Sequence, residues 1–151
     1  MPLLSSHKFW RQDVALDVGT AVTRVAIGMH RLIERPSETA VKRALRGGVV
    51  VDGDAAVAFL KPLLAQVRVF GVVGPRVLAC APSDVKSTER ELLIESIVKA
   101  GASSVVVIPE PLAAAIGAGA DVSSPYAQMV IDIGEATTLW DQIWTEVKGG
   151  E

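Results

Sequence analysis

Short apolar runs and helix-spaced apolar positions alternate along this chain. Two β-rich runs, Val14–Val18 and Thr23–Gly28, are separated by a short segment that contains Gly19 and Thr20. This pattern predicts two strands joined by a tight turn, a hairpin with a polar tip. The next stretch, 31–48, is poorly patterned and rich in charge. We interpret it as a connection with room for a third strand at the edge of a sheet.

A helix and then a strand are predicted next. Asp52 or Asp54 can cap a helix whose apolar positions continue to Val67, and Pro62 would have to be accommodated near its first turns. The run Arg76–Ala81 then has the composition of a buried strand. A helix followed by a buried strand is typical of an α/β protein.

A second helix and strand follow the same order. The segment Ser87–Ala100 has apolar residues at helical spacing, Thr88 and Glu91 have the spacing of a capping box, and Gly101 would end the helix. The β-branched run Val105–Ile108 is of the kind found in central strands. The repeated order predicts an α/β layer fold with a largely buried sheet.

One more helix, one more strand and a helical tail are predicted in the last part of the chain. Pro111 suits the first helical position of Leu112–Gly119, and Met129–Ile133 is an apolar strand. The tail has a stripe of apolar side chains at helical spacing, namely Leu139, Trp140, Ile143, Trp144 and Val147.

Composition limits the classes of function. With 151 residues, half of them apolar, the chain is expected to form one compact domain. A net charge of -2 argues against nucleic acid as the main partner. No apolar run is long enough to cross a bilayer, and residues 1–12 lack the features of a secretory signal, so we expect the chain to stay inside the cell. Cys80 lies in an apolar run and is expected to be a small buried hydrophobic residue, not a nucleophile or a ligand.

Several segments, in order, resemble the MreB branch of the actin-like ATPase superfamily. Val14–Arg24 resembles the first phosphate-binding hairpin of that family, and Glu110–Gly119 resembles its connecting helix, which is the most specific match. Asp132–Thr138 stands in the place of the second phosphate loop, which in the family reads Asp-Ile-Gly-Gly-Gly-Thr-Thr. Two further segments, Gly48–Asp52 and Pro75–Ser83, also match, so the resemblance covers about residues 13–138.

The resemblance implies a ribonuclease H-like, actin-like ATPase fold, of which this chain holds essentially the first half. Residues 13–125 would form the first domain, and within it 31–48 would be a shortened form of the small subdomain. Residues 126–151 would be the start of the second domain, with its first strand, followed by an amphipathic C-terminal helix. Residues 1–12 would be an N-terminal segment.

The resemblance also implies roles for the hairpin. Gly19 and Thr20 would bring backbone N–H groups and a hydroxyl against phosphate oxygens, because glycine allows close approach of the main chain. Asp17 would face a magnesium ion or its waters, since a hard cation prefers carboxylate oxygen. The alternative is a plain hairpin in which these side chains only satisfy the hydrogen bonds of the turn.

Two residues are implied as catalytic. Glu110 matches the family residue that orients the attacking water, and Thr137 matches a hydroxyl near the terminal phosphate. Asp132, Gly134 and Thr138 would complete the phosphate site. The alternatives are that Glu110 is a carboxylate stabilised at a helix N-terminus and that the threonines cap the final helix.

Two departures from the family pattern oppose ATP hydrolysis. Glu135 and Ala136 replace glycines of the second phosphate loop, which hinders backbone approach and adds a negative charge. A carboxylate about 4 Å from a phosphate charge costs roughly 4 kcal/mol at an effective dielectric constant of 20. In the family, the adenosine pocket and the opposing half of the cleft come after this loop, where the present chain ends. We therefore expect no ATP hydrolysis by the chain alone.

Two classes of function remain open. The first is a degenerate MreB-like interaction protein of the cytoskeletal machinery for cell shape and wall synthesis, which requires no cofactor. The alternative is a small ATP-binding switch, with Mg-ATP as its ligand, whose site a partner or a second subunit completes. Either class predicts a cytoplasmic protein.

Protein partners are expected through residues 129–147, because an apolar strand with unpaired N–H and C=O groups is a template for another chain. The strand would pair with a full-length MreB-like protein, with a second copy, or with the sheet edge of its own first domain. The alternative is a C-terminal helix docked on its own domain. Membrane contact at the inner face of the cell membrane is a separate hypothesis. It rests on Leu3, Leu4, Phe9 and Trp10, and its alternative is a disordered or packed N-terminus.

Overall fold

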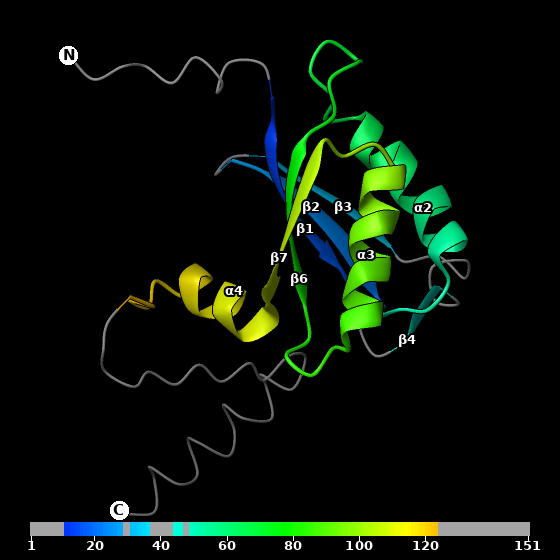
Figure 1. Cartoon of the computed structure of the whole chain (residues 1–151). Coiled ribbons are helices and arrows are strands. Elements are labelled where there is room, and N and C mark those ends of the chain that lie inside the picture. Colours follow the sequence, from blue (N-terminus) through cyan, green and yellow to red (C-terminus); the bar gives the residue numbers. More distant parts are fainter. Residues whose placement is uncertain (1–10, 29–30, 37–43, 47–48, 124–151) are drawn as a thin grey trace, which may run out of the picture. The chain divides into compact units, whose positions relative to one another are not determined.

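The computed structural model divides the chain into two compact units, Met1–Glu110 and Pro111–Glu151. The structure describes residues 11–28, 31–36, 44–46 and 49–123. Most of the described residues belong to the first unit, which holds a mixed sheet and two long helices (Figure 1). None of the helices within the described ranges is both long enough and apolar enough to cross a membrane.

Five strands form the main sheet of the first unit. They are β1 (Asp13–Val18), β2 (Val22–Ile27), β3 (Arg31–Pro36), β6 (Arg76–Ala81) and β7 (Ser104–Pro109). Their order is β3-β2-β1-β6-β7. The strand β2 pairs antiparallel with both β1 and β3, whereas β6 pairs parallel with both β1 and β7. The predicted hairpin, the third strand at a sheet edge and the two later strands are confirmed.

Two helices cover one face of this sheet (Figure 1). They are α2 (Gly53–Ala65) and α3 (Ser87–Lys99), which pack against each other. A small antiparallel pair, β4 (Leu45–Arg46) and β5 (Val49–Val50), precedes α2 and was not predicted. The strand β5 packs against α3, so this small pair joins the same core.

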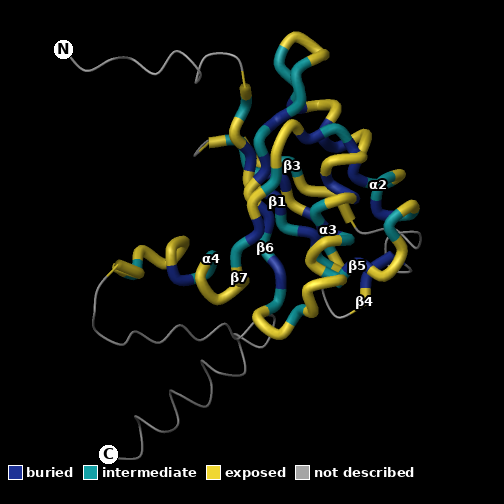
Figure 2. Tube along the Cα trace, in the orientation of Figure 1, coloured by how far each residue is buried: buried dark blue, intermediate teal, exposed yellow. Residues whose placement is uncertain are grey.

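The core lies between the sheet and the two helices (Figure 2). Alternate residues of β1 point into it, because successive side chains of a strand face opposite sides. The largest fully buried apolar side chains are Leu16, Val25, Val50, Leu60, Leu63, Leu64 and Ile97. They come from strands and from both helices, so one continuous hydrophobic cluster holds the unit together.

The other face of the sheet, which we call the open face, is partly exposed. Leu78 on β6 and Val106 on β7 point to this face and are 42% and 60% exposed. The prediction of a largely buried sheet is therefore wrong for these positions. Among the described residues, β7 is the last strand of the sheet, although the run Val105–Ile108 has the composition of a central strand.

Asp52 caps the helix α2, as predicted. The backbone N–H of Ala55 donates a hydrogen bond to Asp52 Oδ1 at 3.1 Å, which satisfies one of the free donors of the first turn. Pro62 lies inside the helix, close to its C-terminal end and on its exposed side, so its predicted position near the first turns is wrong. Pro62 has no N–H for the carbonyl oxygen of Ala58, but Ala58 is exposed, so water can bind that oxygen instead.

The helix α3 begins earlier than the predicted capping box implies. Its N-cap residue is Lys86, whose backbone N–H donates to Glu89 Oε2 at 2.9 Å. The box predicted from Thr88 and Glu91 is wrong, although it used the same spacing. The predicted end at Gly101 is confirmed, since Gly101 has a φ of +114°, in the region that favours glycine.

The second unit is described only as far as residue 123. The helix α4 (Glu110–Gly117) starts at the junction of the units, with Pro111 in its first turn, and so lies within two residues of the prediction at each end. The predicted strand at 129–133 and the C-terminal helix lie outside the described residues. So do the N-terminal Leu3, Leu4, Phe9 and Trp10.

Candidate functional site

Asp17 projects from β1 onto the open face, directly opposite Arg24 on the neighbouring strand β2. Arg24 Nη1 lies 3.5 Å from Asp17 Oδ2, and Arg24 Nε donates a hydrogen bond to Glu34 Oε1 on β3 at 2.8 Å. The hydrogen bond to Glu34, with further contributions from Asp17, raises the pKa of Arg24 above its ordinary value. A permanent cation is thus placed between two carboxylates.

The tip of the hairpin is as tight as its sequence suggests. A Cβ atom at Gly19 would lie 2.5 Å from the backbone carbonyl oxygen of Val22, a separation that side chains do not tolerate. Glycine is therefore required for the turn itself, whatever the tip binds. Thr20 is exposed beside it, and its hydroxyl is accessible to a ligand.

Cys80 belongs to this site, which the sequence did not predict. Its Sγ lies 3.9 Å from Asp17 Oδ1 and 4.0 Å from the carbonyl oxygen of Leu16. The residue is half-buried on the open face and is not a member of the hydrophobic core. Burial, together with the negative charges of Asp17 and Glu110, raises the pKa of the Cys80 thiol to about 11. The thiol is therefore protonated at neutral pH.

Alkylation of Cys80 is expected to be slow in the folded chain. At pH 8, a thiol with a pKa of about 11 has a thiolate fraction about 100-fold lower than one at the ordinary value of 9.0, and only the thiolate reacts. Iodoacetamide modification, followed by mass spectrometry, should show this difference between the native chain and the urea-unfolded chain. Reactivity of the native chain should rise as the pH approaches 11. Equal rates for the two forms at pH 8 would contradict the assignment.

Glu110 is exposed at the end of β7, where it starts α4. Its negative charge adds, after burial and the Asp17 carboxylate, to the raised pKa of the Cys80 thiol. Of the predicted site residues, Asp17 contacts this thiol, with Oδ1 at 3.9 Å from Sγ. The other predicted site residues, Asp132, Gly134, Thr137 and Thr138, lie outside the described part of the chain.

Magnesium does not fit the donor set around Asp17. One carboxylate oxygen faces a guanidinium and the other faces a thiol, and neither group is a ligand that a hard cation prefers. Across the ranges that the structure describes, no group of three or more His, Cys, Asp or Glu side chains could hold a metal ion. The role that the family resemblance implies for Asp17 stays a prediction, and the guanidinium and thiol beside its carboxylate argue against it.

A shallow hollow lies at the carboxyl ends of the two parallel strands β6 and β7. Its volume is about 290 Å³, and Ser83, Arg90 and Glu91 contribute polar groups to its lining. The Arg90 guanidinium already donates to the carbonyl oxygen of Val107 at 2.7 Å. Ligand pockets usually measure about 300–1,000 Å³, so the volume of this hollow is at the lower limit. Neither Asp17 nor Glu110 is among the residues that line it.

Comparisons with known proteins agree with this architecture. A family model described as MreB/Mbl protein matches residues 26–140. The cell shape-determining protein Mbl of Bacillus subtilis (strain 168) is 36% identical over 128 residues, which is 83% of this chain and 38% of that protein. The cell shape-determining protein MreB of Escherichia coli (strain K12) is 38% identical over 133 residues, 85% of this chain and 38% of that protein.

A solved structure gives the same result for the fold. The crystal structure of MreB5 of Spiroplasma citri bound to ADP superimposes with a TM-score of 0.69 and 26% identity, covering 82% of this chain and 46% of that one. The chain therefore spans less than half the length of the relatives described here. Since the family model, the curated relatives and the superimposed crystal structure agree, the chain belongs to the MreB/Mbl family and has an α/β actin-like ATPase fold.

Proposed function

We propose that this chain acts in cell-shape determination, as a cytoskeletal protein of the MreB type that works through its protein surfaces and does not hydrolyse ATP by itself. The relatives named above are cell shape-determining proteins. The observation that carries the second half of the proposal is the pairing of Asp17 with Arg24, because it occupies the carboxylate that the resemblance assigns to magnesium. Glu135 and Ala136, in place of loop glycines, add to this.

A phosphate-release assay combined with co-sedimentation tests the proposal. The chain alone, supplied with Mg-ATP, should release no phosphate above the buffer blank. Escherichia coli MreB is the full-length control, for which the family resemblance implies ATP hydrolysis, and this chain should pellet with the assemblies that this control forms. Phosphate release by this chain at a rate similar to the control, or its absence from the pellet, would contradict the corresponding half of the proposal.

The second candidate is a nucleotide switch completed by a partner. One observation favours it: the exposed Thr20 stands beside the tight turn at Gly19, where its hydroxyl can reach a phosphate. The relative from Spiroplasma citri is a nucleotide-binding protein, since its structure contains ADP. This candidate predicts that a fluorescent ATP analogue binds the mixture of this chain and a full-length MreB more tightly than either protein alone.

Self-association through residues 129–147 is a further part of the proposal, supported by the apolar strand pattern at Met129–Ile133 and the stripe with Trp140 and Trp144. Removal of residues 126–151 is therefore expected to convert an oligomer to a monomer, as size-exclusion chromatography with light scattering would measure. If the full chain and the shortened chain each had the mass of a single subunit, pairing between copies would be eliminated. They would favour the alternative of a C-terminal helix docked on its own domain.

Membrane contact is proposed through a second element besides the N-terminal Leu3, Leu4, Phe9 and Trp10. The loop between α2 and β6 holds Phe70 and Val72 in solvent, where they are 78% and 80% exposed. Mutual backbone hydrogen bonds between Val69 and Val73, both 3.0 Å long, close the loop. Phe70 has a φ of +52°, uncommon for a bulky residue, which keeps its ring at the tip.

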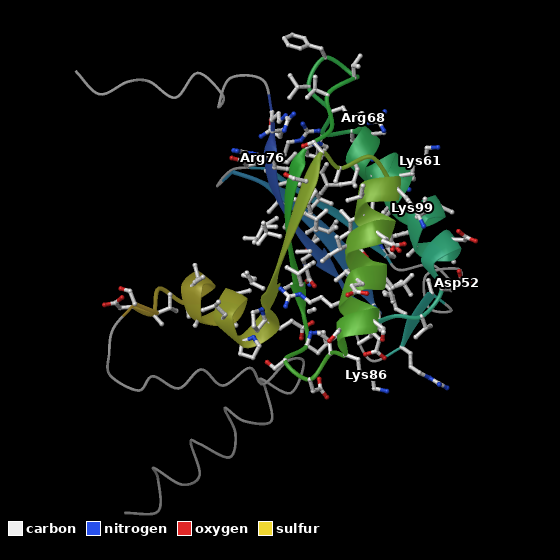
Figure 3. The ribbon with its side chains drawn as sticks, in the orientation of Figure 1. Asp52, Lys61, Arg68, Arg76, Lys86 and Lys99 are labelled. Carbon is white, nitrogen blue, oxygen red and sulfur yellow. The ribbon has the colours of Figure 1, made fainter. Side chains whose placement is uncertain are left out.

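Basic residues accompany this apolar tip. Figure 3 shows Arg68 at the base of the loop, with Lys61 and Lys99 on the neighbouring ends of α2 and α3. Stable binding to a membrane interface needs two contributions: apolar side chains insert between the lipids, and cations attract the anionic headgroups.

Replacing both Phe70 and Val72 by serine is expected to weaken vesicle binding at least about tenfold. A fully buried Val or Phe side chain contributes about 1.5–3 kcal/mol, so even partial insertion of the two exceeds the 1.4 kcal/mol that corresponds to tenfold. Flotation with vesicles of phosphatidylglycerol and phosphatidylcholine measures the change. Leu32→Ser is the matched control, because Leu32 is 57% exposed but lies on β3. Equal binding by the double variant and this control would exclude the loop.

A further inference from the structure

A row of alternating charges crosses three strands on the open face. Glu34 on β3, Arg24 on β2 and Asp17 on β1 stand directly opposite one another in the strand register. All three side chains are about half exposed, so solvent and ions reach them. The row therefore presents one cation held between two anions.

The cation in this row is held more firmly than an isolated surface arginine. Its Nε donates to Glu34 Oε1 at 2.8 Å, which fixes the guanidinium plane from the side of β3. With that end fixed, Nη1 is directed at Asp17 Oδ2, at 3.5 Å. Directly opposite cross-strand pairs of unlike charge stabilise each other, so the register itself holds Arg24 in place.

Both oxygens of Asp17 are already approached. The guanidinium faces Oδ2, and the protonated thiol of Cys80 lies 3.9 Å from Oδ1. An incoming divalent cation would have to displace the thiol and accept a fixed positive charge close by. Like charges at such distances repel, and an arginine cannot lose its proton to relieve the repulsion.

We propose that Arg24 takes the place of a metal ion at Asp17, so that the positive charge of this site is a covalent part of the chain and divalent cations are excluded from it. The inference rests on the proposed function to the extent that the hairpin is related to a phosphate-binding hairpin. It goes further, because it assigns the loss of metal binding to one residue. Arg24 is thus a specificity-determining residue, and its removal should strengthen the binding of a divalent cation at the Asp17 carboxylate.

Titration of the full chain with Mn²⁺, followed by electron paramagnetic resonance, tests the assignment. Mn²⁺ shares the preference of Mg²⁺ for carboxylate oxygen and reports binding without any nucleotide. Arg24→Gln should bind one Mn²⁺ at least about tenfold more tightly than the unmodified chain, because a fixed like charge is removed. The gain should disappear in the double variant Arg24→Gln with Asp17→Asn, which locates the ion at Asp17.

Arg76→Gln is the matched control. Arg76, on β6, pairs with both carboxylate oxygens of Asp13 on β1, so its removal also takes a guanidinium away from a carboxylate of the same sheet. That variant should leave Mn²⁺ binding within about twofold of the unmodified chain. Circular dichroism confirms that each variant is folded.

Two results would overturn the assignment: an unmodified chain that binds Mn²⁺ as tightly as Arg24→Gln, or a gain that persists without the Asp17 carboxylate. Each of these results can be distinguished from a result that contradicts the proposed function. Phosphate release from Mg-ATP by the unmodified chain would remove that proposal, whereas the Mn²⁺ titration measures only which cation occupies Asp17.

Discussion

Shortening Leu60 to alanine is expected to lower the free energy of unfolding by about 2–5 kcal/mol. Leu60 projects from α2 into the core and is 0% exposed, so its removal loses buried apolar contact and leaves a cavity. The side chains around this cavity belong to close-packed helices and strands, which cannot move far enough to fill it. Urea unfolding followed by circular dichroism at 222 nm measures the change as a lower midpoint.

Leu32→Ala is the control for this substitution, because it removes the same atoms from a side chain that is mostly in solvent. The expected loss is within about 0.5 kcal/mol. Similar losses for the two variants would show that the helices do not form the core described for the first unit.

Alanine at Gly74 is expected to destabilise the fold by about 1–3 kcal/mol or more. The added Cβ would collide with the backbone carbonyl oxygen of Gly101, where the chain before β6 crosses the end of α3. Backbone hydrogen bonds prevent relaxation there, since the Ser103 N–H donates to the carbonyl oxygen of Pro75 at 2.8 Å. Thermal unfolding measures the effect as a lower Tm.

Gly117→Ala is the matched control for this crossing. No atom lies within 4 Å of a Cβ built at Gly117, and alanine favours a helix over glycine. This control should unfold at the same temperature as the unmodified chain or slightly higher. If Gly74→Ala behaved in the same way, the close crossing would not exist in solution.

Most of the first unit could be predicted from the sequence because its signals are local. Period-two alternation and a glycine tip specify the β1–β2 hairpin, and continuous apolar runs specify β6 and β7. Asp52 and Gly101 mark helix ends through the hydrogen bonds and the backbone conformation that they allow. These residues act within a few positions of themselves, so no knowledge of the tertiary structure is required.

The wrong predictions arose where the outcome depends on tertiary packing or where one sequence fits more than one local structure. A continuous apolar run does not reveal which of its residues faces the core, so Leu78, Cys80 and Val106 were expected to be buried although they point to the open face. Strands as short as β4 and β5 have no measurable period. The start of α3 was misplaced because Ser, Thr and Glu occur together there and satisfy more than one capping register.

In the candidate site, too, some residues could be identified from the sequence and others depend on the tertiary structure. Asp17, Gly19 and Glu110 were identified by resemblance to the family, which carries no information about side-chain partners in this chain. Arg24 was missed, yet the hairpin register contained the signal: a tight turn after Val18 places residues 17 and 24 opposite each other on one face. Cys80 could not be assigned to the site, because its proximity to Asp17 depends on the parallel pairing of β1 with β6.

Calorimetric titration with Mg-ATP tests the central claim most directly, namely that the site around Asp17 in this chain no longer binds nucleotide on its own. MreB5 of Spiroplasma citri, whose crystal structure contains ADP, is the positive control. A variant of this chain with Glu135→Gly and Ala136→Gly shows what the loop glycines contribute. We expect no heat of binding from the unmodified chain at micromolar ATP. A Kd in the micromolar range for the unmodified chain would contradict the account.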